Sequence, residues 1–333
     1  MIVTNLYRKL VNEKEIVDFL KSDFPLEEIF DLLFLDDDRR IIYKTLYSGI
    51  GNTPVHEVAL PNDNTLFIKL ESTNSCGGNH YSRYWLIHLA LAESFRLIIP
   101  QVSKIIEVTS GSSGISLAMA CKRLGYQLTL VIPDLLPAGR VIPMLESGAR
   151  LIKVKGYIKN CIERLNIEKC NDKYYSPNHS EEKSDLICFV FARIASEFIS
   201  REKRCPDKIL LGLGNGTSLV GIAHRFKLEN PTAEVYSFCP DKDKKQIVFG
   251  LYADNLFFRH MLEVGNLVDK QLYIQNFNCE DIRNKFIDDD VILSLGHSSL
   301  YAIDLACNLA EISKRQIFFT VGYDKIERYY DNI

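Results

Sequence analysis

The chain has 333 residues, a formal net charge of −3, 47% hydrophobic and 25% charged residues, which is ordinary for a folded globular protein. This length suits one large α/β unit or two smaller lobes. The lack of a basic surplus argues against nucleic acid as a partner, and no apolar stretch reaches the roughly 20 residues of a membrane-spanning helix. Because the N-terminal stretch also lacks the apolar core of a secretion signal, the sequence predicts a cytoplasmic protein that spans no membrane.

Nine cysteines occur without CxxC pairing, and several lie in apolar segments such as Ala120-Cys121. In a cytoplasmic chain this pattern is typical of reduced, buried thiols. The sequence therefore predicts neither disulfides nor a metal site.

Residues 1–48 are predicted to form a helical N-terminal extension. Ile16, Phe19 and Leu20 recur at helical spacing, and a second apolar segment follows over residues 26–34. Such an extension either docks a protein partner or a second subunit, or packs as a helical pair on its own domain. The second arrangement is the more common one for amphipathic helices.

From residue 66 onward, short β-rich runs alternate with helical stretches. This alternation predicts right-handed βαβ crossovers and mostly parallel sheets. The predicted strands are 66–70, 104–108, 127–132, 150–154, 208–211, 234–238 and 316–320. The predicted helices are 84–94, 115–124, 141–146, 218–226 and 300–309. A polar stretch at 173–183, which contains Pro177-Asn178, separates the two series and is the predicted linker.

Two turns rich in small residues each join a predicted strand to a predicted helix. They read Thr109-Ser110-Gly111-Ser112-Ser113-Gly114 and Gly212-Leu213-Gly214-Asn215-Gly216-Thr217-Ser218. N–H groups at the start of a helix favour an anion, although serine and glycine also fill tight loops for steric reasons alone. The second turn lacks GxGxxG spacing and a following Walker lysine, so a phosphate monoester suits it better than a dinucleotide or a nucleoside triphosphate.

Seven ordered motifs resemble one family. They are IGNTP at 50–54, KLE with an asparagine at 69–74, TSGSSG at 109–114, GY at 125–126, IPD at 132–134, GAR at 148–150, and the turn at 214–218 with the strand after it. Over roughly residues 48–330 the chain resembles the fold type II pyridoxal-phosphate (PLP) enzymes. This family includes cysteine synthase, cystathionine β-synthase and a siderophore diaminopropionate-precursor synthase.

The resemblance implies a two-lobed α/β fold like that of the tryptophan synthase β chain, with parallel sheets, flanking helices and PLP between the lobes. The smaller lobe would comprise residues 75–175, and the larger lobe residues 49–74 and 176–333. A small amino-acid substrate and a homodimer are implied as well.

The resemblance also assigns site residues. The cofactor phosphate would be held by Gly214, Asn215, Gly216, Thr217 and Ser218, and the substrate carboxylate by Thr109, Ser110, Gly111, Ser112 and Ser113. Ser112 stands where the family has an asparagine at the cofactor ring. His297 and Ser298 lie near the serine expected at the pyridine nitrogen, and His297 is either a ligand or an ordinary loop residue.

The catalytic segment departs from the family pattern. The family's NPxxSxKDR is similar to residues 74–83, which are one residue longer, and alignment on Arg83 places Tyr81 at the Schiff-base lysine. No lysine occurs between Leu70 and Ser103, and a phenol cannot replace an amine in a Schiff base. His80 and Tyr81 are therefore either catalytic groups or aromatic side chains of the pocket wall.

Two functions remain open at this point. The first is a divergent enzyme of amino-acid or secondary-metabolite biosynthesis that performs β-replacement or β-elimination on a serine- or cysteine-derived amino acid. It would bind PLP without a tether and use Tyr81 or His80 for proton transfer. The second is a catalytically silent homologue that binds an amino acid, a PLP adduct or a partner protein.

Overall fold

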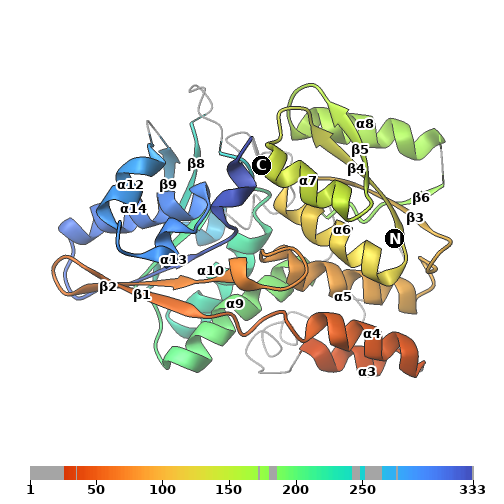
Figure 1. Cartoon of the computed structure of the whole chain (residues 1–333). Helices are drawn as coiled ribbons and strands as arrows, with labels where there is room; N and C mark the ends of the chain where they lie inside the picture. The colour runs from red at the N-terminus through yellow and green to blue at the C-terminus, as the bar shows by residue number, and fades with distance from the viewer. Residues whose placement is uncertain are drawn as a thin grey trace.

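The structure is a computed structural model, and it describes residues 26–34, 36–171, 173–179, 186–241, 248–251, 265–274 and 277–331. The predicted helical spacing of Ile16, Phe19 and Leu20 lies outside these ranges. Two mostly parallel sheets with helices around them form the α/β fold that the resemblance implied (Figure 1).

The larger sheet has six strands in the order β1-β2-β10-β7-β8-β9. Its strands are β1 (Val55–Leu60), β2 (Asn64–Lys69), β7 (Lys208–Gly212), β8 (Glu234–Pro240), β9 (Lys270–Ile274) and β10 (Ile317–Val321). β1 and β2 form an antiparallel hairpin with Asn62 and Asp63 in the left-handed conformation of its turn, and the other neighbours pair in parallel. The carboxyl ends of the five parallel strands β2, β7, β8, β9 and β10 therefore lie at one edge.

The smaller sheet has the order β5-β4-β3-β6, and all of its pairs are parallel. Its strands are β3 (Lys104–Val108), β4 (Gln127–Pro133), β5 (Arg150–Val154) and β6 (Tyr174–Tyr175). In Figure 1 this sheet and its helices lie to the right of the larger sheet.

Helices flank both sheets. Around the smaller sheet lie α5 (Tyr81–Ser94), α6 (Ser112–Leu124), α7 (Ala138–Glu146) and α8 (Ile158–Asn171). Around the larger sheet lie α9 (Leu186–Glu202), α10 (Thr217–Glu229), α12 (Cys279–Lys285), α13 (Asp290–Leu293) and α14 (His297–Glu311). Short 3₁₀ turns occur at η2 (Glu71–Thr73) and η3 (Ile326–Tyr329).

The described part of the N-terminal extension packs on its own domain. It comprises η1 (Leu26–Glu28), α3 (Ile29–Leu33) and α4 (Asp37–Tyr47), which lie below α5 in Figure 1. Phe30 and Tyr43 are fully buried and stack with ring centroids 5.5 Å apart. Both belong to the same apolar cluster as the buried residues of α5, and Arg39 of α4 forms a salt bridge of 2.6 Å with Glu93 of α5, so apolar packing and charge both attach the extension to α5.

The predicted elements agree with the structure best where apolar runs are long. Strands 104–108 and 150–154 have the predicted bounds, whereas α5 and α6 each begin three residues earlier than predicted.

The linker prediction was wrong in part, because β6 within 173–183 pairs with β3. A two-residue edge strand carries too little pattern to be found without its partner. The strands β1 and β9 and the helices α8 and α9 were not predicted.

All nine cysteines lie in the described residues, and none forms a disulfide. Four of them, Cys121, Cys161, Cys188 and Cys239, are buried as predicted. The prediction of burial was wrong for Cys170, which is exposed near the end of α8.

None of the helices between residues 26 and 331 that the structure describes has the length and hydropathy needed to cross a bilayer.

Candidate functional site in the cleft between the lobes

The two turns rich in small residues face one cavity. Both turns follow the carboxyl end of a parallel strand, β3 or β7, and each opens a helix, α6 or α10. Ligands of open α/β sheets bind at such strand ends. The cavity is lined by four residues of the first turn, Thr109, Ser110, Ser112 and Ser113, and by four of the second, Gly212, Gly214, Asn215 and Ser218.

The first turn is held in shape by its own side chains. Thr109 Oγ1 accepts hydrogen bonds from the N–H groups of Gly111 (3.1 Å) and Gly114 (2.9 Å). Gly111 has φ of 140°, and a Cβ there would lie 2.4 Å from the Arg140 side chain. The turn therefore needs glycine at 111, and the first-turn N–H groups of Ser112 and Ser113 lie outside the internal hydrogen-bond ladder of α6.

The second turn is equally constrained. Asn215 Oδ1 accepts from Thr217 N (3.2 Å) and Thr217 Oγ1 (2.8 Å), and Gly216 caps α10 with φ of 87°. A Cβ on Gly214 would lie 2.5 Å from the Gly250 carbonyl oxygen. Gly216 and Thr217 thus shape the turn, while Gly214, Asn215 and Ser218 line the cavity.

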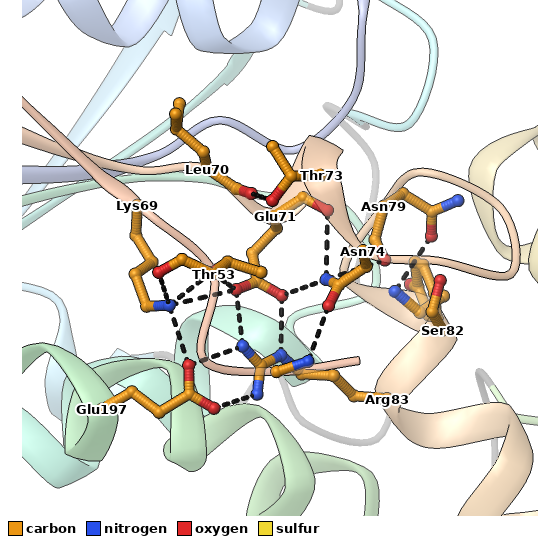
Figure 2. A network of polar contacts seen from close by, with 12 residues as sticks. Thr53, Lys69, Leu70, Glu71, Thr73, Asn74, Asn79, Ser82, Arg83 and Glu197 are labelled. Atoms are coloured by element: carbon orange, nitrogen blue, oxygen red, sulfur yellow. Dashed lines mark hydrogen bonds and ion pairs between the residues drawn. The ribbon is translucent and has the colours of Figure 1, made fainter. Parts of the chain in front are cut away.

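A buried network of charges supports the segment between the larger sheet and α5 (Figure 2). Arg83 donates to both oxygens of Glu71 at 2.7 Å and to Glu197 at 2.5 and 2.8 Å. Lys69 Nζ also donates to Glu197 at 2.8 Å, and Asn74 Nδ2 to Glu71 at 2.7 Å. Burial alone would raise the pKa of Glu197, but Arg83 and Lys69 outweigh it and lower that pKa to about 2.

Asn79 connects this segment to the first turn. Its Nδ2 donates to the Ser112 carbonyl oxygen (3.0 Å), and its Oδ1 accepts from Tyr81 N (2.9 Å) and Ser116 Oγ (3.0 Å). The start of α5 is therefore fixed beside the turn that opens α6.

His80 and Tyr81 both line the cavity at the start of α5. The Tyr81 ring meets His179 and Phe191 edge to face, at 5.6 and 5.4 Å between centroids. Burial lowers the pKa of His80 to about 3, and its Nδ1 has no hydrogen-bond partner among the described residues. His80 is thus neutral near pH 7 and a weak base.

Ser298 and His297, which the resemblance placed near the cofactor's pyridine nitrogen, lie differently. Ser298 lines the cavity, whereas His297 is not among the lining residues and its ring stacks on that of Tyr329 with centroids 4.2 Å apart.

None of the described residues that line the cavity is a lysine. Lys242, Lys244 and Lys245 lie outside the described ranges. No group of side chains suited to a metal ion occurs in the described part of the chain.

The sequence interpretation missed two charged residues of the cavity, Arg140 and Asp324. Asp324 accepts from Ser112 Oγ (2.8 Å) and from Arg140 Nη2 (3.2 Å), and Arg140 Nη1 donates to the Ser110 carbonyl oxygen (2.9 Å). Asp324 comes three residues after the end of β10. A carboxylate so close to the carboxyl end of a parallel strand was a signal that could have placed it at the site.

Two lobes with mostly parallel sheets, and a strand-to-helix turn rich in small residues on each side of the cavity between them, define a protein of the fold type II class. The chain belongs to the family of pyridoxal-phosphate dependent enzymes, whose profile matches residues 46–247. PLP is the cofactor of that family.

Individual relatives are distant. A cysteine synthase of a Flavobacterium species is 30% identical over 205 residues, which are 60% of this chain and 66% of that protein. The chain thus spans just under two thirds of that relative's length. Cysteine synthase B of Pseudomonas aeruginosa is 24% identical over 86% of this chain and 96% of its own. The crystal structure of a hydrogen sulfide-producing enzyme from Fusobacterium nucleatum superposes with a TM-score of 0.72 at 25% identity, over 85% of this chain and 98% of that one.

Proposed function

We propose that this chain is a silent member of the PLP family, which binds PLP or its adduct with an amino acid without a covalent tether. The observation that carries the proposal is the wall of the cavity at the start of α5. There Tyr81 stands where the resemblance places the Schiff-base lysine, with a neutral His80 next to it, while the two turns rich in small residues remain.

The donor set of the cavity suits two anionic groups. The glycine-rich turn before α10 would hold the phosphate through its N–H groups, Asn215 and Ser218. The N–H groups of Ser112 and Ser113 at the start of α6 would hold a carboxylate. An adduct of PLP with an amino acid carries both groups, so it matches the cavity better than either part alone.

The cavity lacks the proton-transfer group of the family at the expected place. PLP, when bound, supplies an electron sink for a carbanion at the amino acid's α carbon, but a base must still remove the α proton. A neutral phenol is a poor proton acceptor, and the low pKa of His80 makes that histidine a poor base as well. Loss of a general base costs about 10²- to 10⁴-fold in rate.

A comparison of two ligands tests the missing tether. Pyridoxamine phosphate has no aldehyde and cannot form a Schiff base with lysine, so a tethered site prefers PLP strongly. We expect calorimetry to give Kd values for PLP and pyridoxamine phosphate that agree within roughly tenfold. A stoichiometric pyridoxyl-lysine after borohydride reduction, at Lys69, Lys122 or within 242–247, would show a tether and overturn the proposal.

A matched pair of variants tests whether residue 81 occupies the place of the family's Schiff-base lysine. Tyr81→Lys should gain a borohydride-stable pyridoxyl label at residue 81, because it returns an amine to the cavity wall. Tyr157→Lys introduces the same side chain at a tyrosine that is 62% exposed, and it should gain no stoichiometric label. Equal labelling of the two variants would mean that residue 81 has no special position.

A second candidate is a divergent β-replacement or β-elimination enzyme acting on a serine- or cysteine-derived amino acid. It is favoured by the position of Tyr81 on the cavity wall beside His179. If Tyr81 transfers the proton, protein with added PLP will turn over O-acetylserine, and Tyr81→Phe will lower kcat about 100-fold with little change in KM. Full activity of Tyr81→Phe would exclude that role.

A further inference from the structure

Three polar side chains lie in a row on the smaller-lobe side of the cavity. Ser113 Oγ is 3.3 Å from His179 Nε2, and His179 Nδ1 is 3.6 Å from Glu107 Oε2. The backbone N–H of His179 also donates to Glu107 Oε2 at 3.2 Å. Ser113 and His179 line the cavity, and all three residues are at most 6% exposed.

The neighbours of this row determine where its protons lie. Trp85 Nε1, which can only donate, lies 3.1 Å from Ser113 Oγ. The Ser113 oxygen therefore accepts from Trp85 and keeps its own proton available for His179 Nε2. The Glu107 carboxylate lies 3.6 Å from His179 Nδ1, so it acts on the imidazole through proximity and not through a hydrogen bond. The serine end of the row thus suits a Ser-His pair in which His179 is the base.

The backbone around Ser113 is also arranged as a nucleophile needs it. Ser113 is the second residue of α6, in the strand–turn–helix segment that follows β3 and Gly111. Nucleophilic serines of α/β hydrolases lie at the turn of a comparable strand–turn–helix segment. The N–H groups of Ser112 and Ser113 open the helix and can donate to a developing oxyanion.

We propose that Ser113 and His179, with the Glu107 carboxylate 3.6 Å from the imidazole, form a nucleophile and base that cleave a small carboxylic ester in this cleft. Because an anion-binding turn flanks each side of the cavity, the ester is expected to carry an anionic group. The inference does not depend on PLP binding, since none of the three side chains needs the cofactor.

The reaction would run in two balanced halves. Ser113 Oγ attacks the ester carbonyl carbon, His179 Nε2 takes the serine proton, and the alcohol leaves with that proton as the acyl group stays on Ser113. Water then attacks the acyl carbon, His179 takes a proton from the water, and the carboxylic acid leaves as Ser113 regains its proton. The Glu107 carboxylate, 3.6 Å from Nδ1, lies beside the imidazolium and compensates its charge.

A small alkyl fluorophosphonate tests the nucleophile without PLP, because it loses fluoride to an activated serine and leaves a stable adduct. We expect peptide mass spectrometry to find one adduct per chain, on Ser113. His179→Gln should slow the labelling about 100-fold or more, and Glu107→Gln about tenfold, because the first removes the base and the second the charge that supports it.

Control variants distinguish a loss of labelling at Ser113 from a general effect of substitution on the fold. His224→Gln, on α10 and not among the lining residues, and Ser94→Ala, at the end of α5, should label at the rate of the unmodified protein. The inference is overturned if the unmodified protein takes up no label, if the label falls on another serine, or if His179→Gln labels Ser113 at the original rate. Any of those results would leave the row as a structural tie between β3, α6 and residues 176–179.

Discussion

His80 shows how position in the fold, and not residue type, sets the chemistry of a side chain. Near its ordinary pKa a histidine next to a cleft would be a ready base. Here the rings of Tyr81, Phe191 and Tyr323 surround it at 4.3 to 5.0 Å, and burial lowers its pKa to about 3. The residue therefore acts as an apolar part of the cavity wall.

This low pKa predicts a pH dependence of stability. Between about pH 3 and 6.5 the unfolded chain binds more protons at this residue than the folded chain, so stability falls as the pH falls through that window. From pH 7 to pH 5 the unmodified protein should lose about 2 kcal/mol more than His80→Gln. Urea unfolding at both pH values measures the difference. Tyr81→Phe, which removes no histidine, should keep the original slope, and equal slopes for all three proteins would contradict the buried neutral state.

At the scale of single elements, the turns before α6 and α10 depend on close backbone approach. Gly214 is the clearest case, because a Cβ there would lie 2.5 Å from a carbonyl oxygen of the neighbouring chain segment. Such a contact cannot be relieved by rotating a side chain. A side chain at 214 therefore requires the backbone of the turn or of residues 248–251 to shift.

Gly214→Ala should accordingly disturb both folding and binding. We expect a loss of about 1–3 kcal/mol in the free energy of unfolding and about tenfold or more in affinity for pyridoxamine phosphate. Gly265→Ala is the matched control, because no heavy atom lies within 4 Å of its added Cβ and its φ is not positive. Unchanged affinity of Gly214→Ala would show that this turn does not hold the phosphate.

The buried salt bridges of Arg83 allow a prediction about the free energy of unfolding. Arg83→Met removes the arginine from both Glu71 and Glu197 and leaves the Lys69 pairs in place, which should cost about 3–5 kcal/mol. Arg164→Met removes a 2.6 Å pair with Glu168 on α8, where the arginine is 48% exposed, and should cost at most about 1 kcal/mol. Equal losses in denaturant unfolding would mean that the network contributes no more than an exposed pair.

In the whole molecule, one apolar cluster connects the N-terminal extension with both lobes, which are far apart in the sequence. It contains residues of α3, α4, α5 and α9 and of strands from both sheets. The described part of the N-terminal extension is thus continuous with the interior of both lobes.

Tyr43→Ala tests whether this extension belongs to the domain. Its fully buried ring packs on Phe30 and Phe34, and its hydroxyl donates to Glu93 at 3.0 Å. We expect a loss of about 3–5 kcal/mol. Ile41→Ala, at a position 57% exposed on the same helix, should change stability by about 0.5 kcal/mol or less. A small effect of Tyr43→Ala would instead favour a separable docking element.

The sequence by itself determined the family, the α/β class and the positions of both turns rich in small residues. Local causes suffice for these features, since apolar runs define buried strands and small residues define strand-to-helix turns. The missing lysine in 70–103 was equally visible, because it is a property of the chain itself.

Only the tertiary structure decided which polar residues meet in the cavity. Asp324 contacts Ser112 and Arg140, and His179 contacts Ser113 and Glu107, across separations of 66 to 212 residues. No local pattern encodes such contacts, because they depend on sheet order and on where the carboxyl ends of strands meet. The low pKa of His80 has the same origin: desolvation depends on what the fold packs around a side chain.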